Sequence, residues 1–145
     1  MEQTGSYLFV YGTLLDTGNE FAAYLNNNCS IHTKGKFKGR LYDIGEYPGA
    51  VAGNNSNGYV YGNIVLIHNP ITVFKQLDDY EGFGNDQQQP NLFIRELMEI
   101  ETAEDIIDCW VYLYNLPVKE LVLIESGDYL EYKDLGQQPG VPRNT

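Results

Sequence analysis

The sequence predicts a single domain of the α+β class, spanning residues 1–145, in which strands predominate. The length is that of one domain, and 43% hydrophobic with 20% charged residues is an ordinary globular mixture, which excludes wholesale disorder. The chain holds 12 Tyr and 15 Gly, which favour short strands joined by tight turns. Most apolar segments are short and bounded by turn residues, whereas only one has a clear helical pattern.

Six segments have the composition of strands. Gly35 and Gly39 predict a bend or bulge in the second, which is read as one strand or two. Asn57-Gly58 predicts a hairpin between the third and the fourth, and a tight turn over residues 102–105 predicts antiparallel pairing of the last two. The apolar run 118–124 fits a strand or a helical turn. The predicted strands are residues 7–11, 31–44, 50–53, 58–67, 92–102 and 106–114.

The clearest helix follows the fourth strand. Asn69 is a suitable N-cap, Pro70 suits the first helical position, and Gly82 is a natural left-handed stop. A second, short helix is expected over residues 20–25, after N-cap residues at 17–19. The apolar rows predicted to face the core are Ile71, Phe74 and Leu77, and Val73, Leu77 and Tyr80.

Charge and motif content argue against several classes of partner. Nine basic against 20 acidic residues give a net charge of −11, which repels nucleic acid and anionic membranes, and no apolar run approaches the ~20 residues of a membrane span. Cys29 and Cys109 make no disulfide framework, and the start lacks signal-peptide features, so a cytoplasmic location is expected. His32 and His68 lack partners at ligand spacing, so no metal site is expected. Residues 133–145 are expected to be a disordered tail.

The end of the clear helix carries an unusual set of charges. The sequence Leu77-Asp78-Asp79-Tyr80-Glu81-Gly82 puts three carboxylates and no base at the negative end of the helix dipole, which favours Lys, Arg or His. The dipole, like-charge neighbours and partial burial all raise the pKa of an acid that points inward. Asp78 and Asp79 are expected to face water, whereas Glu81 can point elsewhere and is a candidate acid-base residue. The alternatives are a solvated helix end and a hard-cation site.

A second candidate site lies where the first strand ends, at Tyr11, Gly12, Thr13 and Leu14. Gly12 allows a sharp turn, after which successive N–H groups could point at one spot and bind a carboxylate or polarise a carbonyl. An ordinary turn after a buried strand is the alternative.

A third group of candidates lies on the last two strands. Trp110, Tyr112 and Tyr114 alternate onto one strand face, either as core residues or with Tyr114 lining a pocket. Arg95 is expected to be a structural ion-pair partner.

Seven pieces of the chain also occur in a characteristic order, from about residue 7 to residue 114. They are FVYGTL (9–14), GRLYDIG (39–45), YPG (47–49), GYVYG (58–62), LDDYEG (77–82), FIR (93–95) and WVYLY (110–114). In this order they resemble the gamma-glutamylcyclotransferase-like family, which includes gamma-glutamylamine cyclotransferase and AIG2-like proteins. Each piece alone is weak, but their shared order is fairly specific.

The resemblance implies a small, mixed, mostly antiparallel β-barrel with a few flanking short helices and a cavity inside it. It implies that residues 11–14 line the substrate pocket through their backbone and that Glu81 is the acid-base residue. Tyr114 stays a further substrate-binding candidate on the strand pattern described above. The implied activity is cyclisation of the gamma-glutamyl moiety of a small amide to 5-oxoproline, with release of the amine. This chemistry requires no cofactor, because the substrate carries its own nucleophile.

Two other functions stay open at this stage. A non-catalytic domain could use the same cavity to bind a small amino-acid derivative, and a hydrolase could use water in place of the internal amine. The polar loop at residues 84–91 could act as a lid that selects the leaving group. Substrates in the family range from gamma-glutamyl amino acids to gamma-glutamyl-lysine and glutathione, and no oligomeric state is predicted.

Overall fold

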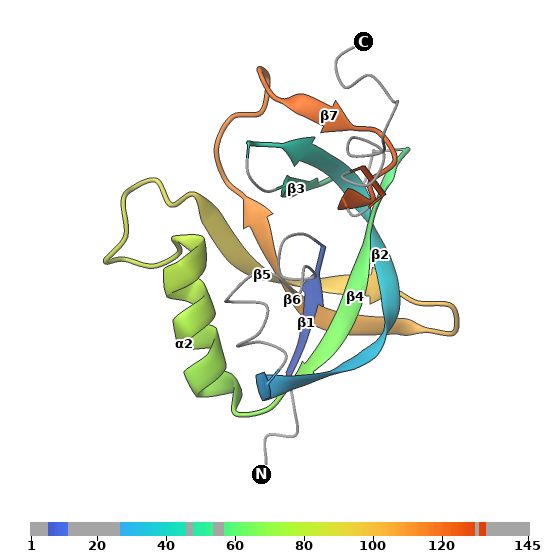
Figure 1. Ribbon diagram of the computed structural model, residues 1–145, viewed down its shortest axis with the longest axis vertical. Helices are drawn as coiled ribbons and strands as arrows, with labels where there is room; N and C mark the ends of the chain where they lie inside the picture. Colours follow the sequence, from blue (N-terminus) through green and yellow to red (C-terminus); the bar gives the residue numbers. More distant parts are fainter. Residues whose placement is uncertain (1–5, 12–26, 46–47, 54–56, 130, 133–145) are drawn as a thin grey trace, which may run out of the picture.

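The computed structural model describes residues 6–11, 27–45, 48–53, 57–129 and 131–132. The short helix predicted at 20–25, the tail predicted at 133–145 and the site residues Gly12, Thr13 and Leu14 lie outside these ranges. Figure 1 shows the helix at Pro70–Glu81 packed against the side of a strongly twisted sheet. The described elements are β1 (Ser6–Val10), β2 (Cys29–Asp43), β3 (Pro48–Ala52), β4 (Tyr59–Ile67), α2 (Pro70–Glu81), β5 (Phe93–Glu101), β6 (Ile106–Tyr114) and β7 (Val122–Ile124).

Five of the strands close into a barrel. Their order is β2-β4-β1-β6-β5, and β5 returns to β2 where Lys36 pairs with Glu101. The β1–β6 pair is parallel, with Leu8 opposite Trp110, and the other four pairs of the ring are antiparallel. The predicted mixed, mostly antiparallel barrel is therefore confirmed.

The long strand β2 belongs to two sheets. Residues up to Lys38 pair with β4, and from Gly39 onward the strand pairs with β3 and β7. A Cβ atom at Gly39 would lie 2.4 Å from the carbonyl oxygen of Val51, so only glycine fits where the strand changes partners. The register shift in the β2–β4 ladder lies between Ile31 and Thr33. The bulge therefore precedes Gly35 and Gly39, where the sequence predicted a bend or bulge.

The predicted hairpin between the third and fourth strands is wrong. β3 and β4 both pair with β2, on opposite sides in the strand order, rather than with each other. Asn57-Gly58 therefore connects two strands of different sheets, and the Gly58 carbonyl accepts a hydrogen bond from the N–H of Gly39. The long β2 strand pairs with both segments instead.

Two hydrophobic clusters hold the fold together. One fills the barrel and is made of inward-facing residues such as Phe9, Phe37 and Ile64. The other lies between the barrel and α2 and includes Leu8 and Leu77. Because successive residues of a strand point to opposite faces, β1, β4 and β6 contribute to both clusters.

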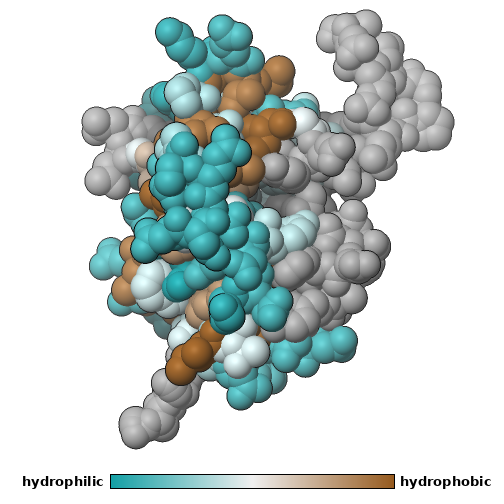
Figure 2. All heavy atoms as spheres, turned by 90° about the vertical axis from the view of Figure 1, so that its left-hand side faces the viewer, coloured by the Kyte–Doolittle hydropathy of each residue, from teal (hydrophilic) through white to brown (hydrophobic). Residues whose placement is uncertain are grey.

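Helix α2 begins and ends where predicted. Asn69 adopts a left-handed conformation (φ 58°) without a side-chain cap bond, and Gly82 ends the helix with φ 78°. Val73, Phe74 and Leu77 are buried, but Ile71 is 89% exposed and Tyr80 is 42% exposed, so the predicted apolar rows are too wide. A helix buries only a stripe, and these two residues lie off it. The side of the molecule that carries α2 is mostly hydrophilic, with hydrophobic patches toward both ends (Figure 2).

Candidate active site

Glu81 is the last residue of α2 and lies on its buried side. It follows the fully buried Leu77 by four residues, which puts the two side chains on one helical face. Gly82 then turns the chain, and the N–H of Phe83 donates to the carbonyl of Asp78 at 2.9 Å. The Glu81 side chain is half-buried and its carboxyl group is largely removed from water.

This environment changes the acidity of Glu81. Burial raises the pKa of its carboxyl group from the ordinary 4.5 to about 7, and among the described residues none forms an ion pair with it. The last turn of α2 carries no base, as the sequence indicated. A carboxylic acid with a pKa near neutrality can both accept and return a proton at physiological pH.

The negative charge of Glu81 raises the pKa of two buried tyrosine hydroxyls, those of Tyr11 and Tyr112. Burial is the main cause that raises the pKa of Tyr11, and the negative charge of Glu81 raises it further. The pKa of Tyr112 is raised by burial first, by Asp78 next and also by Glu81. The carboxyl group therefore lies close enough to the hydroxyls of Tyr11 and Tyr112 to interact with them electrostatically.

The Tyr11 side chain joins three strands beside Glu81. Its hydroxyl donates to the carbonyl of Tyr112 at 2.5 Å and accepts a hydrogen bond from the N–H of Ala50 at 3.1 Å. Tyr11 is thereby fixed at the end of β1, directly before the predicted amide cluster of residues 12–14. That cluster lies outside the described residues, so its role in substrate binding stays a prediction.

The three aromatic residues of β6 share the helix-facing side of the sheet, as predicted. Tyr112 is buried there, while Trp110 and Tyr114 are half-buried and pack against the same cluster. The rings of Tyr114 and Phe93 pack in a T-shaped arrangement with their centroids 5.7 Å apart, and a Cβ atom at Gly49 would lie 2.8 Å from the Tyr114 Cβ. Tyr114 is thus firmly placed, and its contact with substrate stays a prediction.

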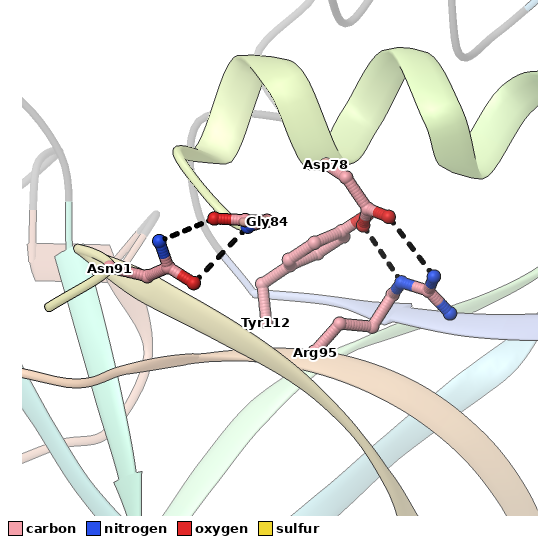
Figure 3. Close-up of polar contacts among 5 residues, drawn as sticks. All are labelled: Asp78, Gly84, Asn91, Arg95 and Tyr112. Carbon is pink, nitrogen blue, oxygen red and sulfur yellow. Dashed lines mark hydrogen bonds and ion pairs between the residues drawn. The ribbon is translucent and has the colours of Figure 1, made fainter. Parts of the chain in front are cut away.

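The structure corrects the expectation that Asp78 faces water. Its carboxylate accepts hydrogen bonds from Nε and Nη2 of Arg95, at 2.8 and 3.0 Å, and from the Tyr112 hydroxyl at 2.7 Å (Figure 3). The expected ion-pair role of Arg95 is confirmed. Asp78 lies four residues after the buried Phe74, and this spacing was the signal in the sequence that it faces the sheet. Its neighbour Asp79 is exposed, as expected.

The loop after α2 is tied together by Asn91, which the sequence did not single out. The Asn91 side chain accepts a hydrogen bond from the N–H of Gly84 at 3.1 Å and donates to the carbonyl of Gly84 at 3.0 Å (Figure 3). It also donates to the carbonyl of Gln88 at 3.2 Å, and its own carbonyl accepts from the side chain of Asn115 at 2.9 Å. The loop predicted as a lid is therefore closed on itself and fastened to the end of β6.

Across the described ranges, no group of three or more His, Cys, Asp or Glu residues is arranged to hold a metal ion. His68 contacts Ser30 at 3.0 Å, and the His32 ring lies 5.1 Å from that of Tyr7. In the same part of the chain, no helix has both the length and the apolar character needed to cross a membrane.

Comparison with known proteins shows the family of the chain. Residues 8–131 match the family described as "Gamma-glutamyl cyclotransferase, AIG2-like". The chain is 34% identical over 128 residues to the gamma-glutamylcyclotransferase family protein YtfP of Escherichia coli K12, which covers 86% of this chain and 96% of that protein. The chain belongs to the gamma-glutamylcyclotransferase family of AIG2-like proteins.

Solved structures show the same fold. The solution structure of E. coli YtfP superposes with a TM-score of 0.62 at 31% identity, covering 88% of this chain and 98% of that one. An AIG2-like protein from Mus musculus gives a TM-score of 0.70 at 21% identity and 99% coverage of both chains. For YkqA from Bacillus subtilis the TM-score is 0.71 at 23% identity, and the match covers 94% of this chain but only 44% of that longer one. The fold expected from the resemblance is confirmed.

Proposed function

We propose that the protein cyclises the gamma-glutamyl moiety of a small amide to 5-oxoproline and releases the amine, with Glu81 as the acid-base residue. The observation that carries the proposal is the half-buried carboxyl group of Glu81 at the end of α2, which has no ion-pair partner among the described residues and whose pKa burial raises to about 7. Family membership supports the same type of activity.

Each step of the proposed reaction has a donor and an acceptor. Glu81 takes a proton from the alpha-ammonium group of the substrate, which frees the amine to attack the gamma-carbonyl and form the five-membered ring. As the former amide C–N bond breaks, Glu81 returns the proton to the departing amine, and the second proton of the ring nitrogen also passes to that amine, which leaves as an ammonium ion. The nucleophile is part of the substrate, so correct orientation alone can supply about 7–11 kcal/mol of the barrier.

The developing negative charge on the gamma-carbonyl oxygen requires hydrogen-bond donors. We assign this role, or binding of the substrate carboxylate, to the backbone N–H groups of Gly12 to Leu14, with Tyr114 as an additional pocket residue. Tyr11 supports the assignment because it is anchored next to these residues and senses the charge of Glu81. The net charge of −11 favours a cationic or zwitterionic substrate at long range.

The test is product identification. Purified protein is offered gamma-glutamyl amino acids, gamma-glutamyl-lysine and glutathione, and the products are separated by mass spectrometry. We expect 5-oxoproline from the wild type and none from Glu81→Gln. Asp79→Asn, which removes the same charge from an exposed neighbouring position, is expected to retain activity.

Each other product refutes a particular part of the proposal. Free glutamate would identify a hydrolase that uses water as the nucleophile. Tight binding of these compounds in calorimetry without any product would identify a binding domain. Cyclisation that survives Glu81→Gln would show that another residue moves the proton.

A further inference from the structure

Two attachments hold the end of α2 on either side of Glu81. The first, at Asp78, lies one helical turn before Glu81, and the second, at Gly84, lies three residues after it (Figure 3). The partners of both come from the β5–β6 hairpin and the segments that flank it. Neither attachment contacts Glu81 through its own side-chain bonds, so each can act on it only through the backbone between them.

The first attachment restrains both distance and rotation. Two parallel hydrogen bonds, Arg95 Nε to Asp78 Oδ1 at 2.8 Å and Nη2 to Oδ2 at 3.0 Å, form a bidentate pair whose planar geometry permits one orientation. The Arg95 guanidinium lies 4.5 Å from the Phe74 ring centroid and 4.8 Å from that of Trp110. Asp78 and Arg95 are each 20% exposed, so the pair is partly shielded from screening by salt.

The second attachment, called the Asn91 clasp below, is the pair of hydrogen bonds between the Asn91 side chain and the Gly84 backbone. Asn91 accepts from the N–H and donates to the carbonyl of the same residue, Gly84, which resembles one rung of an antiparallel strand pair. The backbone of Asn115 donates to the carbonyl of Leu92 at 3.0 Å, so the clasp is continuous with the β5–β6 ladder. The backbone from Gly82 to Gly84 is thereby held at its far end.

A helix end with these charges needs such attachments. The N–H groups of Gly82 and Phe83 cap the carbonyls of Asp79 and Asp78, but the final turn places three carboxylates and no base at the negative end of the helix dipole. Those charges favour fraying, and fraying would carry the Glu81 side chain out into water. Mutations that displace a reacting group by about 1 Å can cost on the order of 100-fold in rate.

We propose that Asp78 and Asn91 are positioning residues that hold the carboxyl group of Glu81 against the site where the substrate reacts. This inference rests on the proposed function for its kinetic consequence, but not for its structural one. Arg95 and Tyr112 act with Asp78, and Asn115 acts with Asn91.

The kinetic test uses substitutions that preserve charge. Asp78→Glu keeps the carboxylate but lengthens the side chain between α2 and Arg95, and Asn91→Ala deletes the clasp. The matched controls are Asp79→Glu and Asn85→Ala, which make the same changes at exposed positions nearby. At a temperature well below unfolding, we expect both positioning variants to lower kcat about tenfold or more, with KM within about twofold and both controls unchanged. Unchanged kcat in correctly folded positioning variants would overturn the inference.

A titration of Glu81 separates this inference from the proposed function. The carboxyl carbon of Glu81 is followed by NMR between pH 4 and 9 in the wild type and the four variants. Within the described ranges, the titratable groups near Glu81 are Tyr11, which directly follows β1, and Tyr112 of β6, together with its neighbours Asp78, Asp79 and Tyr80 on α2.

In Asp78→Glu and Asn91→Ala, Glu81 is expected to be exposed to water and to titrate with a midpoint nearer pH 4.5. In the two controls it is expected to keep its wild-type midpoint. An unchanged midpoint in both positioning variants would overturn the inference, even if the protein were inactive toward every substrate tested. A shifted midpoint in an inactive protein would support the positioning role while the proposed function failed.

Discussion

Replacing Glu81 by glutamine is expected to stabilise the folded protein at high pH and to leave its stability unchanged at low pH. The folded pKa of about 7 lies above the ordinary value of 4.5. Below pH 4 the carboxyl group is protonated in both the folded and the unfolded states, so it contributes no difference. Between about pH 4.5 and 7 the unfolded chain ionises while the buried carboxyl group of the folded chain keeps its proton, so stability falls across this interval and reaches its full loss above pH 7.

The size of the effect follows from the two pKa values. At about 1.36 kcal/mol for each pH unit between them, the full loss is about 3 kcal/mol above pH 7. A glutamine of the same shape cannot ionise and avoids the loss. With a urea dependence of about 2 kcal/mol/M, the midpoint of unfolding should rise by roughly 1.5 M at pH 8 and by nothing at pH 4.

The measurement is urea unfolding at pH 4, 6 and 8, followed by fluorescence. The chain contains one tryptophan, Trp110, which packs beside Phe74 of α2 with ring centroids 6.2 Å apart, so the signal reports on this region directly. Asp79→Asn serves as the control, because it removes a charge from an exposed position two residues before Glu81 on α2. A stability difference that is the same at all three pH values, or that favours the wild type at pH 8, would refute the burial of Glu81.

The remaining predictions concern activity, packing and thiol chemistry. The kcat/KM for cyclisation should rise with pH about a midpoint near 7, because the ionised form of Glu81 is the base, and a pH-independent profile would contradict this. Gly62→Ala should destabilise the protein by about 2 kcal/mol or more in urea unfolding, because the new Cβ would lie 2.2 Å from the carbonyl oxygen of Val10. Burial raises the pKa of Cys109 to about 12 and of Cys29 to about 11, so iodoacetamide at pH 8 should modify both only slowly until the protein is unfolded, as mass spectrometry can follow.

Local signals in the sequence predicted the elements well. The N-cap position, Pro70 and Gly82 defined α2 to the residue, and the turn at 102–105 defined the β5–β6 hairpin. These features depend on a few neighbouring residues, and their physical causes are visible in the sequence itself. Alternation along β6 likewise predicted which of its aromatic residues share a face.

Pairings between distant segments could not be predicted in the same way. The Asn57-Gly58 signal suggested a hairpin, but β2 binds both flanking strands, and nothing local to the turn reveals that competition. Asp78 was expected in water because its partner Arg95 is 17 residues away on another element. The importance of Asn91 depends on a contact with Gly84 across a loop whose path is set only in the folded protein.

The candidate site was predicted from an unusual charge distribution at the end of α2 rather than from a known catalytic sequence motif. Three acids and no base at the C-terminus of a helix are unfavourable for the helix dipole. In the structure, one of these acids, Glu81, is buried, and burial raises its pKa. That residues 12–14 line a substrate pocket with Glu81 is implied by the resemblance to the family and stays a prediction.

Barrel closure sets the order in which the protein can assemble. The pair that completes the ring, Lys36 with Glu101, joins residues far apart in the chain, and β1 cannot gain its parallel neighbour until β6 has been synthesised. A growing chain on the ribosome can therefore form β2 with β3 and β4 early, but the ring stays open until more than two thirds of the chain has emerged. Because so many contacts are non-local, we expect refolding in milliseconds to seconds rather than microseconds.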